Sequence, residues 1–512
     1  MKKWMTALLT AALLLQTACA STARAPLPAP ELLERTEIVK DADLDIQKGY
    51  PPERPLVQEI IPELKPEPAE TAKPEQKPET VPESPKTEEK AEEQKAPPEQ
   101  PPEPSTEKEP AAAPPEKEPA PVPEKQPEPT PAPAPVPEKP GTASASQDDE
   151  IRAVWFSYFE YASLLTGQSE SSFTQNIRTA FSNVASLGLN TVIVHVRPYA
   201  DALYPSDYYP WSYIVTGEEG KAPGFDPLRI MIREAHNLDL DLEAWINPYR
   251  VRNGNNKEPL SSEHPVRSLL DSGDAIQYKN GIYLDPSSEE ARQLIVDGVV
   301  EIVQNYPVDG IHFDDYFYPT TDAAFDAEAY SSYRNNGGDM NLGDWRRDNV
   351  NKLVRRVYRS IKQTDPSVRF GISPQGNMEN NYDQQFIDVE LWLSEEGYVD
   401  YICPQIYFGF DNSTCPYEET VQAWNDLIGH NDVELYIGLS PFKIGLEEAW
   451  AGDGKQEWKT ARNLLGRMVE TARENNHYRG FAMFRYDSMF HPAQNVSQQM
   501  NRELSYLEEL FH

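Results

Sequence analysis

Two adjacent carboxylates, Asp314 and Asp315, follow a short apolar run and are the strongest candidates for chemistry in this sequence. A third acidic residue, Glu243, lies inside another apolar run. Cleavage of a glycosidic bond needs two carboxyl groups, one as the acid and one as the nucleophile or base. We assign Asp314 as the ionised partner, with Arg197 stabilising its charge. The acid stays open between Asp315 and Glu243.

Polar and aromatic residues gather near the ends of similar apolar runs. A sugar ring carries hydroxyls at its edge and C–H groups on its faces, so its site needs planar hydrogen-bonding groups and aromatic rings. Because side chains alternate along a strand, we expect His195 and Arg197 to share one face. The predicted substrate contacts are His195, Arg197, Trp211, Trp245, Asn247, Tyr249, Arg250, His312, Tyr316, Gln405, Tyr407 and Arg485, with Tyr318 as a further ring.

Eight apolar runs rich in β-branched residues alternate with helical patterns between residues 151 and 512. This alternation favours an α/β fold of the (β/α)8 TIM-barrel type, in which the strand ends that carry these residues meet at one face. An open doubly wound sheet would need a Gly-rich turn after its first strand, and the sequence has none there. The predicted strands are Arg152–Tyr158, Asn190–Val196, Leu240–Ile246, Val308–Asp314, Arg369–Ser373, Val399–Tyr407, Glu434–Leu439 and Gly480–Tyr486.

Several helix ends carry their own signals. Asp226 and Pro227 predict the start of one helix, and Ser287 with Glu290 predicts a capping box at the start of another. Gly188 is expected just after the end of a third, where a left-handed residue is common.

The N-terminal part of the chain has a different composition. Residues 51–140 hold 28 of the 48 prolines and 21 glutamates but no aromatic residue, which predicts disorder. Lys2, Lys3 and the apolar stretch that follows resemble a secretory signal, and Cys19 stands where a bacterial lipoprotein is lipidated. We therefore predict a signal peptide over 1–19, a disordered linker over 20–150 and a barrel over 151–512. Ordinary signal cleavage, giving a free secreted protein, stays open.

Charge and composition narrow the partners. The net charge is −36, of which −23 falls on residues 151–512, and this argues against nucleic acid as a ligand. No group of residues has convincing metal-ligand spacing, so we predict neither a metal nor a cofactor. Cys403 and Cys415 are either both free or paired with each other. We expect a monomer.

Ordered motifs run across residues 151–490, among them Arg152–Phe156, Val196–Pro198, Ala244–Arg250, Tyr283–Pro286, Gly371–Pro374 and Pro404–Tyr407. In these motifs the chain resembles the glycosyl hydrolase-like 10 family of bacterial envelope proteins. The resemblance implies a barrel, an envelope location and glycoside hydrolysis, and the studied members act on peptidoglycan glycan strands. It carries Asp314, Asp315, Asn247, Tyr249, Arg250 and Gln405 across as motif positions, without assigning the acid or the nucleophile.

These observations together predict a membrane-anchored extracytoplasmic hydrolase that cleaves cell-wall glycan strands. Its expected partners are the glycan strand and, through Cys19, the membrane. Two alternatives stay open: a non-catalytic scaffold that binds wall glycan, and a hydrolase of a secreted polysaccharide.

Overall fold

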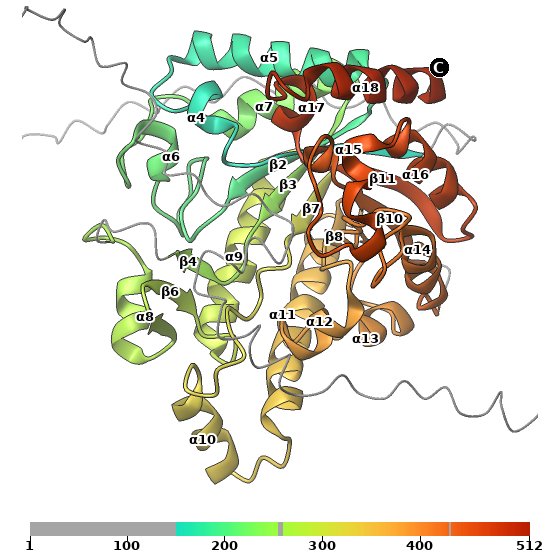
Figure 1. Ribbon diagram of the computed structural model, residues 1–512. Helices are drawn as coiled ribbons and strands as arrows, with labels where there is room; N and C mark the ends of the chain where they lie inside the picture. The colour runs from blue at the N-terminus through green and yellow to red at the C-terminus, as the bar shows by residue number, and fades with distance from the viewer. Residues whose placement is uncertain (1–149, 254–259, 430–431, 512) are drawn as a thin grey trace, which may run out of the picture. The chain divides into compact units, whose positions relative to one another are not determined.

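The computed structural model describes residues 150–253, 260–429 and 432–511, and these form a closed parallel barrel with helices around it (Figure 1). The predicted TIM barrel is confirmed. The predicted signal peptide, Cys19 and the linker lie outside the described residues. Neighbouring strands follow the order β1, β11, β10, β9, β8, β7, β3, β2 and back to β1. The strands are β1 (Ile151–Phe156), β2 (Thr191–Arg197), β3 (Asp241–Ile246), β7 (Gly310–Phe313), β8 (Arg369–Ile372), β9 (Tyr401–Ile402), β10 (Glu434–Leu439) and β11 (Tyr478–Met483).

Each barrel strand is followed in the sequence by a helix. These helices are α5 (Glu170–Ser186), α7 (Pro227–His236), α9 (Glu289–Asn305), α11 (Leu342–Thr364), α13 (Val389–Ser394), α14 (Tyr417–Asp426), α16 (Leu464–Arg473) and α18 (Ser497–Phe511). None of the helices in the described ranges is long and apolar enough to cross a membrane.

The connections carry further short elements. One is an antiparallel sheet between β3 and β7, formed by β4 (Arg250–Arg252), β6 (Gly281–Leu284) and β5 (Ala275–Tyr278). The others are α4 (Tyr161–Leu164), α6 (Tyr213–Thr216), α8 (Val266–Ser272), α10 (Ala327–Asn335), α12 (Met378–Asp383), α15 (Glu457–Thr460), α17 (Tyr486–Phe490) and the 3-10 turns η1 (Pro441–Lys443) and η2 (Gly452–Gln456).

Two of the three predicted helix ends are confirmed. The Asp226 side chain accepts a hydrogen bond from Arg229 N at the start of α7, and Gly188 has a φ of 87° after α5. The capping box of Ser287 and Glu290 is wrong. Ser287 N instead donates to Asp285 Oδ1, which keeps Ser287 in the preceding turn, and Ser288 caps α9.

Strand β9 is shorter than predicted because Pro404 has no N–H to donate. The pairing nevertheless resumes one residue later. Gln405 N donates to Pro374 O at 2.9 Å, and Gln405 bridges to Gln375 and Gly438. This irregular strand end therefore still holds Gln405 at the level where the other strands finish.

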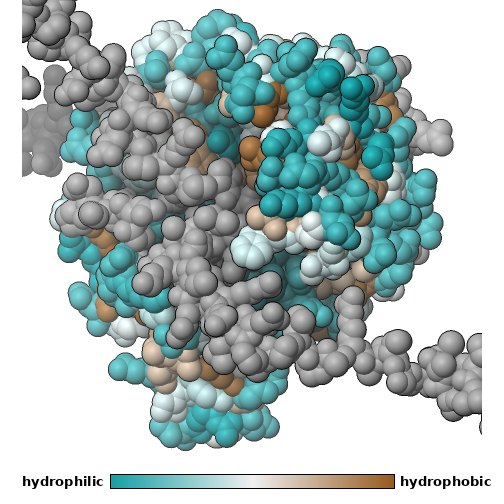
Figure 2. Space-filling view, viewed as in Figure 1, coloured by the Kyte–Doolittle hydropathy of each residue, from teal (hydrophilic) through white to brown (hydrophobic). Residues whose placement is uncertain are grey.

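Apolar side chains fill two separate regions. The larger lies between the strands and the surrounding helices. The smaller fills the barrel interior and is unusually rich in aromatic rings, with Trp155, Trp245, Tyr401, Tyr407, Tyr436 and Phe484 among its members. On the face drawn in Figure 2 the described surface is mainly hydrophilic, with apolar residues in small patches.

A β-bulge in β2 changes the direction of one predicted site residue. Pairing with β3 runs in register up to His195 opposite Trp245, and then shifts so that Arg197 stands opposite Ile246. Since Ile246 faces the outer core, Arg197 faces it too, and the expectation that it shares a face with His195 is wrong. Its guanidinium lies 4.3 Å from the Tyr209 ring centroid and against Gly298 of α9.

The space that Arg197 fills makes Gly298 sensitive to substitution. A Cβ at Gly298 would overlap Arg197 Nη1 and would lie 2.5 Å from the Tyr209 ring, and Arg197 is too buried to move aside. We expect Gly298→Ala to lower the free energy of unfolding, because overpacking costs about 1–3 kcal/mol while alanine returns about 1 kcal/mol in helix propensity.

Chemical denaturation measures this effect. Gly343→Ala in α11 is the matched control, because a Cβ there meets the flexible end of Arg347 at 3.2 Å and Asn341 Oδ1 at an ordinary contact distance of 3.5 Å. A gain in stability for Gly298→Ala as large as that for Gly343→Ala would contradict the packing described for Arg197.

Candidate active site

Asp314 follows β7 at the C-terminal mouth of the barrel, and two N–H donors fix its carboxylate. Gln405 Nε2 donates to Asp314 Oδ1 at 3.3 Å, and Asp315 N donates to the same oxygen at 2.8 Å. Gln405 Nε2 also donates to Ser373 O at 3.0 Å. The ends of β7, β8 and β9 therefore meet at this carboxylate.

The buried Tyr407 hydroxyl is affected by the charges of both acidic residues. Burial raises the pKa of the Tyr407 hydroxyl, and the charges of Asp314 and Asp315 raise it further. Both carboxylates are thus close enough to act on the same phenol electrostatically. The Tyr407 ring packs against Phe442 and Phe484 at centroid distances of 5.7 and 6.1 Å.

Arg250 supplies positive charge near the mouth from the first strand of the small sheet. Its guanidinium lies over Tyr316 at 4.3 Å and over Tyr199 at 4.7 Å, and its Nε donates to Pro198 O at 3.3 Å. The charge of Arg250 also helps to lower the pKa of His195, after the larger effect of burial. Tyr316 is only partly buried, so it remains a ring that a sugar can reach.

His195 and Trp245 form a parallel stack, with ring centroids 3.7 Å apart and an interplanar angle of 4°. Burial, the largest cause, holds the pKa of His195 well below its usual value, so the imidazole is neutral. Because the imidazole covers one face of the indole and Trp245 is 3% exposed, the predicted role of Trp245 as an open sugar platform is not supported.

Several buried polar atoms have no hydrogen-bond partner among the described residues, some at the mouth and others on His195 and Trp245, which stand in register with His312. Asn247 Nδ2 donates to Pro198 O, which leaves Asn247 Oδ1 open, and the side chain approaches His195 without reaching hydrogen-bond geometry. Buried polar atoms are normally paired, so a concentration of open ones indicates a place where a ligand binds. The open atoms are both ring nitrogens of His195, Trp245 Nε1, Asn247 Oδ1, Gln405 Oε1 and Ser440 Oγ.

Glu243 lies in the barrel interior instead of at the mouth. It pairs with Gly310, four residues before Asp314, which places the two about 13 Å apart along the strands. Catalytic carboxyl pairs in glycosidases are about 5–9.5 Å apart, so Glu243 is too distant to be the acid. Burial raises the pKa of Glu243 to about 7.

His312 also lies below the mouth, and its exposure is 0%. It hydrogen-bonds to Tyr401 and Ser373, and burial lowers its pKa to about 3. The prediction that His312 contacts substrate is therefore not supported. His312 lies within β7, whereas Asp314 follows the last residue of the strand and lies at the mouth.

Three other predicted contacts lie elsewhere, because side-chain alternation does not continue once the chain leaves a strand. Tyr249 packs on Phe317 in the outer core, and Tyr318 on Phe386. Trp211 packs partly buried against the outer core and pairs with Ala202. Arg485 does lie on the mouth face, after the C-terminal end of β11, and there it forms an ion pair with Glu160.

Glu160 is a buried carboxylate that the sequence did not single out. It accepts hydrogen bonds from Ser157 N at 2.9 Å and Ser157 Oγ at 2.8 Å, and it binds Arg485. Burial raises its pKa. Since Ser157 follows β1 and Arg485 follows β11, this pair joins the two strand ends where the barrel closes. The one sequence signal for Glu160 is that it follows an apolar run closely, as a residue at the end of a barrel strand does.

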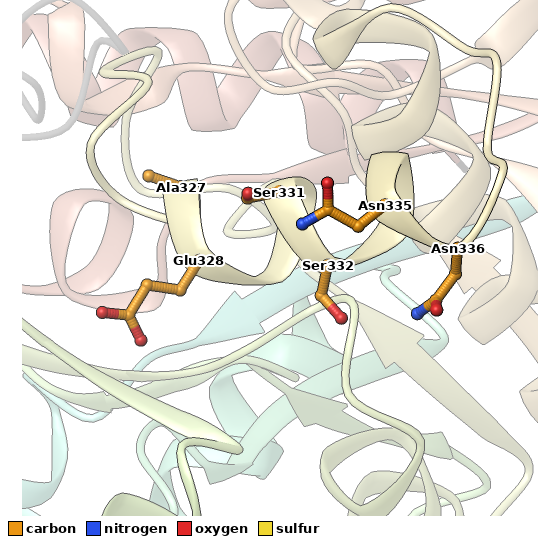
Figure 3. Close-up of a pocket in the computed structure, with 6 residues that line it drawn as sticks. All are labelled: Ala327, Glu328, Ser331, Ser332, Asn335 and Asn336. Atoms are coloured by element: carbon orange, nitrogen blue, oxygen red, sulfur yellow. The ribbon is translucent and has the colours of Figure 1, made fainter.

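The groove along α10 and the possible metal and disulfide sites add no catalytic group. A groove of about 460 Å³ along α10 is lined by Ala327, Glu328, Ser331, Ser332, Asn335 and Asn336, none of them a predicted site residue (Figure 3). Within the described ranges no cluster of His, Cys, Asp or Glu is arranged to hold a metal, and Cys403 and Cys415 are not joined by a disulfide.

Comparison with known proteins gives a consistent set of similarities. The model of the family described as glycosyl hydrolase-like 10 matches residues 150–496. Glycosyl hydrolase YngK of Bacillus subtilis (strain 168) is 37% identical over 366 residues, covering 66% of this chain and 70% of that protein. Glycosyl hydrolase DigH of Escherichia coli (strain K12) is 35% identical over 350 residues, covering 63% and 76%. The solved catalytic domain of a β-amylase from Paenibacillus polymyxa has a TM-score of 0.46 and 12% identity, covering 72% of this chain and 100% of that one.

The raised pKa of Glu243 predicts a pH-dependent stability. The pKa of this carboxyl is 4.5 in the unfolded chain and about 7 in the folded protein. Its contribution to the free energy of unfolding is therefore fully present below pH 4.5 and is lost as the pH rises to 7. Glu243→Gln has no such charge. We expect the free energy of unfolding of the variant to rise relative to that of the native protein between pH 4.5 and 8, by on the order of 3 kcal/mol. Chemical denaturation of both proteins across this pH range measures the effect. A difference in the free energy of unfolding that does not change with pH would contradict the prediction.

Proposed function

Because the chain belongs to the glycosyl hydrolase-like 10 family and is a glycoside hydrolase, we propose that its barrel mouth cleaves the glycan strands of a cell wall. The observation that carries the proposal is the junction of Asp314, Gln405 and Asp315 N at the strand ends, surrounded by open polar atoms. Such a junction suits a ligand rich in hydroxyl and amide groups.

In the proposed reaction Asp314 is the ionised nucleophile or base and Asp315 is the acid. The two N–H donors on Oδ1 fix the orientation of the Asp314 carboxylate before substrate arrives, which removes a reorganisation cost from the chemical step. Asp315 is the other acidic residue whose charge acts on Tyr407. Glu243 has no role as the acid, because it lies too far from Asp314 along the strands.

The chemistry of the mouth favours a neutral or weakly charged glycan. The carbonyl oxygens of Gln405 and Asn247 are open acceptors for sugar hydroxyl or amide groups, and Tyr316 presents a partly buried ring against Arg250. The net charge of −23 on residues 151–512 would repel a strongly acidic polymer.

We propose further that Cys19 carries the lipid that anchors the protein outside the cytoplasm. A Pro/Glu-rich linker with an extended rise of ~3.1 Å per residue would reach at most about 280 Å over ~90 residues. That reach would allow an anchored barrel to meet wall strands away from the membrane.

Asp314→Asn tests the chemistry. The amide keeps the shape and can still accept from Gln405, but it supplies neither a nucleophile nor a base. We expect release of reducing ends from peptide-free wall glycan to fall by roughly 10²–10⁴-fold, while glycan binding is retained. Asp309→Asn is the matched control, because Asp309 lies at the opposite end of the same strand and accepts from Leu242 N.

Two outcomes would count against the proposal. Unchanged release by Asp314→Asn would remove Asp314 from the reaction. Binding without release by the native protein would favour a wall scaffold, and release only from a secreted polysaccharide, seen by product analysis, would replace the wall as substrate.

Cys19→Ala tests the anchor. We expect the native chain in the membrane fraction and the variant in the soluble extracytoplasmic fraction, because each buried lipid CH₂ contributes about 0.8 kcal/mol to membrane binding. Fractionation of the full chain measures this, with Cys415→Ala as the control that keeps Cys19. A soluble native protein would indicate ordinary cleavage and secretion.

A further inference from the structure

Four polar side chains form a continuous hydrogen-bonded chain through the barrel interior, here called the interior column. Tyr401 Oη donates to Glu243 Oε2, His312 Nδ1 lies 2.7 Å from Tyr401 Oη, and His312 Nε2 lies 3.0 Å from Ser373 Oγ. Each of the four residues is at most 4% exposed. They come from β3, β9, β7 and the end of β8, so the column crosses half of the barrel.

Trp155 fixes the direction of these hydrogen bonds. Its Nε1–H can only donate, and it lies 3.2 Å from His312 Nε2, so that nitrogen is an acceptor. His312 therefore carries its proton on Nδ1 and donates to Tyr401, which donates to Glu243. The burial that lowers the pKa of His312 to about 3 keeps the ring neutral.

The same contact argues against Ser373 as a nucleophile. A serine, a histidine and an acid in sequence resemble a nucleophile with its base. Here the Nε2 lone pair already accepts from Trp155 Nε1–H, and the one proton of the Ser373 hydroxyl can go to Phe313 O at 3.4 Å as well as to Nε2. The imidazole is therefore a weak base for Ser373, and at 2% exposure the Ser373 hydroxyl is out of reach of a substrate.

The upper end of the column reaches the groups that hold Asp314. Ser373 O accepts one amide hydrogen of Gln405, and Asp314 Oδ1 accepts from the same nitrogen. Ser373 N donates to Phe313 O at 2.9 Å, directly before Asp314. With both contacts made by Nε2, the Gln405 amide cannot flip, and its Oε1 stays open for a ligand.

We propose that the interior column, from Glu243 through Tyr401 and His312 to Ser373, positions Asp314 and Gln405 for hydrolysis. The inference rests on the proposed function, because it gives the column a role in the reaction at that mouth. Glu243 is then a positioning residue that completes the column at its lower end. A displacement of the reacting group by about 1 Å can cost roughly 10²-fold in rate, so modest loosening is enough to be measured.

Tyr401→Phe is the central test, because it removes one hydroxyl and separates Glu243 from His312. On peptide-free wall glycan we expect kcat to fall at least about tenfold, with KM within about twofold of the native value. Tyr436→Phe is the matched control. Tyr436 stacks on Tyr401 at 4.3 Å, and its hydroxyl donates to Glu434 Oε2 at 3.0 Å, outside the column.

Glu243 variants separate positioning from stability. The carbonyl oxygen of a glutamine can accept the Tyr401 hydrogen bond as the glutamate does, so Glu243→Gln should keep kcat within about threefold. Glu243→Leu removes the acceptor and should lose kcat like Tyr401→Phe. If Tyr401→Phe does not fold, the double variant Tyr401→Phe with Glu243→Leu also removes the buried carboxyl that has lost its donor, so that only His312 Nδ1 is left unpaired, and it should fold with a low kcat.

The outcomes are distinct. A lowered kcat with an unshifted pH–rate profile supports positioning. A kcat equal to that of Tyr436→Phe overturns it, and so does a shifted limb of the profile, which would make the column a proton path. The native enzyme measured in parallel tests the proposed function separately, since its failure to release reducing ends would remove that function whatever the variants do.

Discussion

Closure of the barrel makes its interior a place where every polar side chain needs a partner from the protein. Leaving a buried donor or acceptor unpaired costs about 1–3 kcal/mol. Glu243, Tyr401 and His312 satisfy one another inside a region otherwise filled by aromatic rings. Their pairing explains how a carboxylate is tolerated near the middle of the barrel, and it also gives the mouth a firm support.

The mouth differs from the interior in what it leaves open. Gln405 and Asn247 each use their amide nitrogen to bind the protein and present a carbonyl oxygen without a described partner. The cost of these open acceptors is removed when a substrate supplies hydrogen-bond donors. The interior thus contributes order, and the mouth contributes binding and chemistry.

Small irregularities of the strands decide which residues reach that mouth. The bulge in β2 turns Arg197 outward against Gly298, so Arg250, from the inserted small sheet, is the guanidinium beside Tyr316. The proline in β9 interrupts its pairing but leaves Gln405 at the level of Asp314. The stack of His195 on Trp245 closes one face of an indole that would otherwise suit a sugar.

The sequence by itself determined the barrel, the positions of its eight strands and the place of Asp314 and Gln405 at strand ends, because periodicity and helix caps are local properties of the chain. Only the tertiary structure decided that Arg197 and Tyr249 point away, that Glu243 lies too deep, and that Glu160 joins β1 to β11. The physical reason is that alternation fixes a side chain's face only within a regular strand. Depth in the barrel, bulges and the turns beyond a strand depend on partners that are distant in sequence.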